Sequence, residues 1–425
     1  MKKFLIVFLL TSFLTGIAAA DYDWGGIFEN NSEYSSLDEE LTQYNRMAFW
    51  GRGEFSPELN IYAKGAYIFA YDDEDVEHLP DLSAFYLYGS LDDLFSTGLG
   101  YRVGRFRFRD PGSLILNSTA DGFHLSFPGK HLPVTVGVGF TGLVFIDSSE
   151  ISMSPADEYE NLDDDAVLAT PRLIQYVSGR YNDLPGGTSL TFSLIAQEDL
   201  RTDDFIEDHV SGSGQLHTQY ARLAVSGRFS PDLFYSVSST LQTGQYVIPD
   251  PSDNYNYLAG MAHGSLEYYP DFDMNPLLSL ELLCSSGDSW SNRSGWMGNV
   301  GDDTDMLHRF TPVSKSGKGT VYAAQPGNLI YADLSSSLKP LETVQLILSS
   351  ITFFRAVDGP VSDTSIIEAS GDGLYLGEEL DFTVNWRPYS DLGLALNSGV
   401  FFPNSAVIAD DDPQFSMGGY FSFSF

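Results

Sequence analysis

Phe415-Ser-Met-Gly-Gly-Tyr-Phe-Ser-Phe-Ser-Phe425 is the segment that decides the fold, because Phe415, Met417, Phe421, Phe423 and Phe425 all stand on odd positions. Successive side chains of a β-strand point to opposite faces, so this segment predicts a strand with one apolar face along its whole length. A bilayer on one side and a wet lumen on the other supply the two environments that such a strand requires. We therefore expect a strand of a membrane-spanning barrel, with Phe421, Phe423 and Phe425 as a signal for the barrel-assembly machinery.

The beginning of the chain predicts export. Two lysines precede an apolar run over residues 4–14, and Ala18–Ala20 supplies small residues just before Asp21. The run is too short to cross roughly 30 Å of hydrocarbon as a helix, which takes about 20 residues. We interpret residues 1–20 as a cleaved signal and residues 21–425 as one β-barrel domain in the outer membrane of a diderm bacterium.

Composition excludes several classes of protein. The chain has 425 residues with 14% aromatics and 40 Gly, but it has no long apolar segment after the signal. This is ordinary for an outer-membrane barrel, where each strand supplies only alternate apolar residues and aromatics gather at the interfaces. The formal charge of -36 argues against a nucleic-acid partner, and the single cysteine, Cys284, permits no intramolecular disulfide.

Short turns and long loops alternate along the chain, as in a barrel with tight turns at one rim and extended loops at the other. We expect short periplasmic turns near residues 56–58, 92–93, 128–130, 184–187, 230–232, 271–273, 339–340 and 388–390. We expect long extracellular loops centred on residues 72–80, 110–118, 147–169, 201–213, 248–256, 287–327, 356–373 and 403–413.

These connections join seventeen strands between about Arg46 and Phe425. An even number of strands with both termini in the periplasm requires one more strand, for which Trp24–Tyr34 is the best segment. The sequence therefore predicts an all-β, antiparallel, up-and-down transmembrane barrel of about eighteen strands.

Alternation predicts which side chains face lipid. The lipid-facing sets are Leu59, Ile61, Ala63, Gly65, Tyr67 and Phe69; Leu190, Phe192 and Leu194; Tyr235, Val237 and Leu241; Val344, Leu346 and Leu348; and Leu380, Phe382, Val384 and Trp386. Between Leu99 and Arg109 the apolar parity switches from odd to even positions. We expect a β-bulge at or near Gly104 to reconcile the two halves.

Charge is distributed unevenly between loops and strands. Acidic residues concentrate in the expected outer loops, for example over residues 72–77, 157–165, 302–305 and 410–412. The inward parity of the strands carries a mildly basic set, with fewer acids. The candidate lumen residues are Arg46, Arg52, Lys64, Arg105, Arg107, Arg109, Arg222, Arg228, Arg387, Glu379 and Asp381, with Glu54, Glu267 and Glu281 as further inward acids.

Arg105, Arg107 and Arg109 form the strongest candidate for a constriction. Arginines at alternate positions are costly to hold together unless they face water, carboxylates or an anionic solute. For any one lumen arginine, pairing with a lumen carboxylate competes evenly with guidance of a solute. We expect the acidic loops to be solvated rather than to bind calcium, because runs such as Asp163–Asp165 lack the spaced ligands and turn glycine of an EF-hand.

Two regions resemble the alginate-export family of outer-membrane barrels. Gly377–Pro388 followed by Leu392–Pro403 is similar to that family's C-terminal hairpin, and Val103–Arg109 followed by Asp121–Leu125 is similar to its Gly-Arg strand and Asp-Gly strand. The resemblance implies an eighteen-stranded porin-like barrel. It also implies a strongly basic lumen, from which this chain departs with only 22 Lys and Arg, so we expect a general or differently selective porin rather than an alginate exporter.

The function that the sequence favours is passive passage of small hydrophilic or charged solutes, or of oligosaccharides, without a cofactor. The partners of such a chain are the lipid bilayer, the assembly machinery and the solute. The seven histidines show no zinc-ligand spacing, and we predict neither catalysis nor a metal site. One alternative is an adhesin or receptor that presents the segment 287–327, which could equally plug the pore; another is a transporter of hydrophobic compounds.

Overall fold

The computed structural model describes residues 21–36, 39–72, 75–91, 98–146, 149–161, 166–202, 214–248, 253–289, 306–314, 317–361, 372–408 and 412–425. The expected signal over residues 1–20 lies outside these ranges. None of the helices in the described ranges has the length and apolarity needed to span a membrane.

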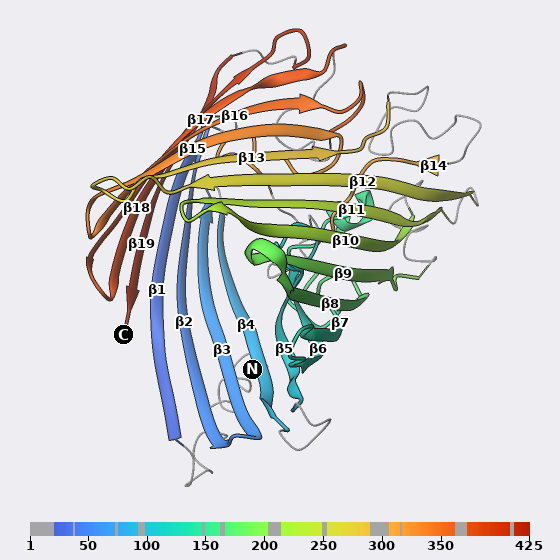
Figure 1. The fold of residues 1–425 in the computed structure, drawn as a ribbon, viewed down its shortest axis with the longest axis vertical. Coiled ribbons are helices and arrows are strands. Elements are labelled where there is room, and N and C mark those ends of the chain that lie inside the picture. The colour runs from blue at the N-terminus through green and yellow to red at the C-terminus, as the bar shows by residue number, and fades with distance from the viewer. Residues whose placement is uncertain are drawn as a thin grey trace.

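Eighteen strands form one closed antiparallel ring. Each pairs with the next, and the last pairs with the first, so that β19 lies beside β1 in Figure 1. The two-residue strand β14 (Met306–Leu307) stands outside the ring, where it pairs in parallel with β12, because β13 pairs directly with β15. The ring strands are β1 Asp21–Ser35, β2 Glu40–Ser56, β3 Leu59–Asp72, β4 Asp75–Ser90, β5 Gly100–Arg109, β6 Asn117–Phe127, β7 Val134–Phe140, β8 Arg172–Leu184, β9 Thr188–Asp199, β10 Gln215–Ser230, β11 Leu233–Ile248, β12 Asp253–Tyr268, β13 Leu277–Ser285, β15 Leu329–Leu341, β16 Val344–Arg355, β17 Tyr375–Tyr389, β18 Leu392–Pro403 and β19 Gln414–Ser424.

This ring confirms the predicted barrel of about eighteen strands. The decisive C-terminal segment is β19, and the strand expected over Trp24–Tyr34 lies within β1. The seam between them is closed by backbone hydrogen bonds, including one in which the N–H of Gly26 donates to the carbonyl of Phe425 over 2.9 Å. Closure pairs the edges of the first and last strands, which is the condition for a sheet to cross lipid.

Two connections are shorter than predicted. β3 continues to Asp72 and β4 begins at Asp75, so most of the loop expected over 72–80 is strand. Likewise β11 ends at Ile248 and β12 begins at Asp253. Acidic side chains suggested a loop in the first case, but a strand can carry such side chains where it extends beyond the lipid into water. The turn expected at 339–340 lies three residues further on, between Leu341 and Val344.

Exposure alternates along the strands with the predicted parity. On β17, the even-numbered Leu380 and Trp386 are 45% and 46% exposed. The odd-numbered Glu379, which points to the other face of the strand, is fully buried. Leu348 and Val237 are likewise exposed on their strands. The lipid-facing sets inferred from alternation therefore lie on the outer wall.

The bulge expected at Gly104 is absent from the described pairing. β5 pairs with β6 without interruption from Gly100 opposite Ser126 to Arg109 opposite Asn117. The irregularity lies in β4, between the residues opposite Lys64 and Ala66. Gly104 has a φ of 128°, and a Cβ there would stand 2.2 Å from the carbonyl oxygen of Phe85, so a close backbone approach requires this glycine.

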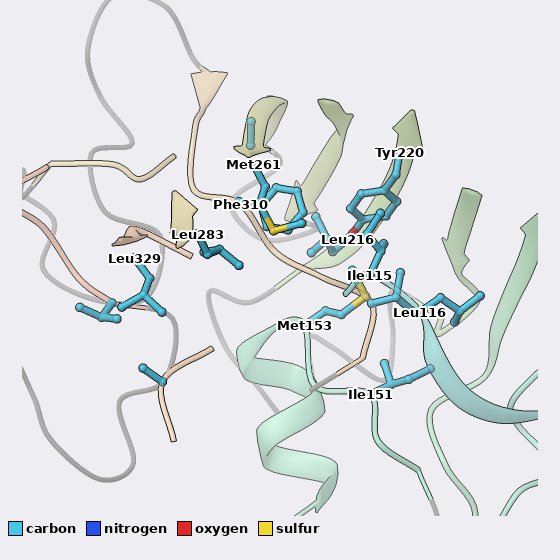
Figure 2. Close-up of a cluster of buried hydrophobic side chains, with 14 of the residues drawn as sticks. Ile115, Leu116, Ile151, Met153, Leu216, Tyr220, Met261, Leu283, Phe310 and Leu329 are labelled. Atoms are coloured by element: carbon cyan, nitrogen blue, oxygen red, sulfur yellow. The ribbon is translucent and has the colours of Figure 1, made fainter. Parts of the chain in front are cut away.

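Segments between strands fold into the barrel and fill one side of it. Their apolar side chains meet those of the inner wall in a buried cluster, and Phe310 and Met153 lie among wall residues in Figure 2. Hydrogen bonds fix the same contacts: the Tyr220 hydroxyl donates to the Thr311 carbonyl over 2.5 Å, and the N–H of Val313 donates to the Ile115 carbonyl over 2.9 Å. The inserted segments include α2 (Pro155–Asn161) and residues 110–116, 306–314 and 317–328.

Candidate functional site

The interior has a filled side and an open side. Inner side chains of β8 to β17, such as Tyr220, Met261 and Phe353, are buried beneath the inserted segments. On β1 to β5 the charged inner side chains Glu29, Arg46, Lys64 and Arg102 are only half-buried, whereas Phe106 and Phe108 of β5 belong to the buried cluster. The open side, bounded by β1 to β5, is therefore the candidate path for a solute.

A charged cluster occupies the inner face of β1 to β3. Glu29 stands directly opposite Arg46, whose Nη1 donates to Glu29 Oε2 over 2.7 Å. The Tyr420 hydroxyl donates to the other carboxylate oxygen of Glu29 over 2.8 Å. Lys64 interacts electrostatically with both Glu29 and Arg46. Two of the predicted lumen cations, Arg46 and Lys64, thus lie together on the open wall around one acid.

Arg102 is the cation of β5 that faces the interior. Its guanidinium carbon lies 4.7 Å from the ring centroid of Tyr86 and 5.2 Å from that of Phe106. Among the described residues no carboxylate forms an ion pair with Arg102, and its buried Nε has no hydrogen-bond partner there. A guanidinium held on aromatic faces without an acid retains donors for an anionic group.

An aromatic row supports Arg102 and extends along the open wall. Trp50 stacks on Tyr62 with ring centroids 6.5 Å apart, Tyr62 stacks on Tyr86 at 5.2 Å, and Tyr86 meets Phe106 edge-on at 5.9 Å. These rings come from four successive strands, β2 to β5. They form a stiff surface of rings and hydroxyl groups beside the guanidinium.

The predicted constriction of Arg105, Arg107 and Arg109 does not lie in the interior. These residues share the outer face of β5 with the exposed Val103, while Arg102, Phe106 and Phe108 take the inner face. The physical reason is the unbroken β5 pairing, since without a bulge the parity cannot switch.

On the outer face these arginines already have partners. Arg105 Nη2 donates to Asp121 Oδ2 over 2.7 Å and also to the Leu143 carbonyl, and Arg107 pairs with Glu150. Arg109 is exposed. Arg102 is absent from the residues predicted to line the lumen, although the bulge expected at Gly104 follows it along the strand and would not have changed its face. Its alternation with the apolar Tyr101 and Val103 is the signal that could have found it.

The remaining predicted lumen residues are divided between two places. Arg222 is buried and holds the segment 110–116, since its guanidinium donates to the Pro111 carbonyl and to the Ser238 hydroxyl. Arg52 pairs with Glu54 on β2, and Arg228 and Arg387 are exposed near the ends of their strands next to short turns. Arg222 is therefore structural, whereas the other three lie toward the ends of their strands that adjoin short turns.

Glu379 and Asp381 do not contact a free lumen. Glu379 accepts hydrogen bonds from the N–H groups of Val321 and Tyr322 over 2.7 and 3.0 Å, and so binds an inserted hairpin to β17. Gly319 of that hairpin has a φ of 97°, and a Cβ there would stand 2.6 Å from Glu379 Oε2. This hairpin of the segment 287–327 therefore packs against the inner face of β17.

A fully buried ion-pair network fixes α2 inside the ring. Arg172 Nη2 donates to Asp157 Oδ1 over 2.7 Å, and Arg201 Nη2 lies 3.1 Å from the same oxygen. Asp199 pairs with both arginines. Burial by itself would raise the pKa of Asp157, but the charges of Arg172 and Arg201 outweigh it and lower the pKa to about 2.

No protein-family model and no curated protein matches this chain, so the resemblance to alginate-export barrels is not confirmed beyond its strand number. Solved structures match over the whole barrel. The crystal structure of Pseudomonas aeruginosa OccK5 (OpdH) aligns with a TM-score of 0.58 and 11% identity over 95% of this chain and 98% of that chain. The outer membrane protein OpdK from P. aeruginosa gives 0.57 and 10% over 95% and 99%, and OpdK with vanillate gives 0.57 and 11% over 95% and 98%. At these identities the likeness shows the fold alone.

Proposed function

We propose that this chain is an outer-membrane channel for passive passage of small hydrophilic or charged solutes. The observation that carries the proposal is the division of the interior, in which inserted segments fill the side of β8 to β17 while charged inner side chains of β1 to β5 stay half-exposed. A barrel that served only as a scaffold would not need an open wall with an arginine that lacks a carboxylate partner. The likeness to a solved outer membrane protein, and to a structure of it with vanillate, supports the same function.

The barrel would have a fixed orientation and a route of export. Short turns face the periplasm and the longer connections face outward, with residues 1–20 removed on export and the C-terminal strand recognised by the assembly machinery. A cation near the aromatic row favours entry of solutes that carry a negative charge, because field lines concentrate in a narrow low-dielectric lumen. Arg102 is the side chain we assign to that role, with Arg46 and Lys64 as the neighbouring cations of the path.

The test is the reversal potential and conductance of the refolded protein in a planar bilayer under a salt gradient. Discrete conductance steps with a measurable ion preference are the expected result. Resistance to unfolding in cold detergent shows that the barrel is folded. A folded barrel that inserts but conducts no current would contradict the proposed channel function and favour a closed transporter.

A further inference from the structure

A second charged site lies on the filled side of the barrel, against β12, β13 and β15. Lys318, from an inserted segment, places its Nζ 2.7 Å from Glu281 Oε2 and 2.6 Å from Asp333 Oδ2. The same Nζ lies 5.3 Å from the ring centroid of Tyr331. Two carboxylates and an aromatic ring around one nitrogen are the groups that recognise a primary ammonium ion.

The wall itself holds these groups in position. Glu281 and Asp333 stand directly opposite each other in the pairing of β13 with β15. The Tyr331 hydroxyl donates to Glu281 Oε1 over 2.7 Å, and His263 Nε2 lies 3.0 Å from the same oxygen. The Ser349 hydroxyl donates to Asp333 Oδ1 over 2.5 Å. Three wall residues, Tyr331, His263 and Ser349, therefore support the carboxylates independently of Lys318.

Lys318 reaches the site from a hairpin with its own attachments. Lys318 and Ala324 exchange backbone hydrogen bonds of 2.9 and 3.1 Å, and the ring of Tyr322 stacks on Phe401 with centroids 4.9 Å apart. Together with the bonds from the hairpin tip to Glu379, these contacts position the backbone without the ammonium group. Removing the Lys318 side chain should thus empty the site while the hairpin stays in place.

The site is also partly exposed to the lumen. The side chains of Lys318 and Glu281 remain 23% and 30% exposed, so the charges are not sealed from ions in the interior. Without the ammonium of Lys318, this wall would present an excess of negative charge to a permeating ion.

We propose that Glu281, Asp333 and Tyr331 form a binding site for a primary ammonium group, which Lys318 occupies as a tethered internal ligand, and that this occupancy sets the ion preference of the channel. The inference rests on the proposed function for its effect on current, but the binding site itself does not require that the barrel conducts.

The experiment is chemical rescue of Lys318→Ala with n-butylammonium, measured in planar bilayers. The variant should shift the reversal potential toward cations, and n-butylammonium should restore the wild-type value with a half-effective concentration at least about tenfold lower than any effect on wild type. Tetramethylammonium has no N–H donor and should not restore it. Lys339→Ala, which removes an exposed lysine of β15, should leave ion preference unchanged.

The second variant to measure is Lys318→Ala/Glu281→Gln/Asp333→Asn. It removes both carboxylates together with Lys318, so no acid is left unpaired and the barrel is less prone to misfold. It should conduct with nearly wild-type ion preference and show no response to n-butylammonium. Unchanged ion preference in Lys318→Ala, or equal rescue in the triple variant, would overturn the inference. If wild type forms no pores, thermal unfolding in detergent still decides: n-butylammonium should raise the midpoint of Lys318→Ala but not that of the triple variant, and equal midpoints in both would overturn the binding site.

Discussion

Arg102 lies over the ring of Tyr86, its guanidinium carbon 4.7 Å from the ring centroid, on the inner face of two neighbouring strands. Arg105, only three residues later, points the opposite way and pairs with Asp121 on the outer wall. One strand thus carries one cation into the lumen and a second away from it. This contrast gives a matched pair of arginines for testing which face controls passage.

We expect Arg102→Gln to reduce anion preference, because it removes a lumen cation that no described carboxylate neutralises. The matched control is Arg107→Gln, which removes an equal charge from the outer wall of the same strand. Reversal potentials under a potassium chloride gradient measure both. A similar shift in the two variants would show that net charge, rather than position on the inner wall, sets the preference.

The barrel could be predicted from the sequence because alternation with a period of two shows which face of each strand is apolar. That pattern is local and can be read in β17 and β19 without knowing which strands lie beside them. The residues that line the lumen could not all be predicted in this way. The parity switch around Phe106 was a real feature, but its cause is an inner wall that is apolar where inserted segments cover Phe106 and Phe108, not a bulge. Contacts such as Phe310 against Tyr220 join distant parts of the chain, and no local pattern encodes them.

Gly104→Ala should destabilise the barrel because alanine resists a φ of 128° and its Cβ would meet the Phe85 carbonyl. Strain of this kind costs on the order of 1–3 kcal/mol. Gly51→Ala is the control, since a Cβ at Gly51 has nothing within 4 Å. Urea unfolding of the refolded barrels compares them, and equal midpoints would mean that β4 and β5 separate at little cost.

Asp157→Asn should loosen α2, because it leaves Arg172 and Arg201 with less negative charge in a site that excludes water. Breaking a buried ion pair costs on the order of 3 kcal/mol. Asp183→Asn, which alters the exposed pair with His131, should have little effect on the free energy of unfolding. Limited proteolysis within residues 149–161 reports the loosening directly. Equal cleavage rates in wild type and Asp157→Asn would exclude the network as the attachment of α2.

Acid should weaken the same attachment in a defined range. The pKa of Asp157 is about 2 in the folded barrel, below its ordinary value of 3.8, so ionised Asp157 stabilises the fold fully above pH 4. That stabilisation is lost as the pH falls from about 4 to 2, and it amounts to about 2 kcal/mol. Protease resistance of α2 should fall over this range in wild type and vary less in Asp157→Asn. Parallel profiles would assign the acid sensitivity to other carboxyl groups.

The cluster that fills one side of the interior has a consequence for how the chain folds. Ile115, Met153, Leu216, Phe310 and Leu329 come from widely separated parts of the sequence, yet they pack together (Figure 2). Such contacts close very long loops of chain, so their entropic cost is met only after the intervening strands are in place. Packing of the interior is therefore expected to be a slow, late event that follows strand pairing. Newly inserted barrels should pass through a stage in which the ring of strands has formed while the inserted segments and their apolar side chains are still exposed to water.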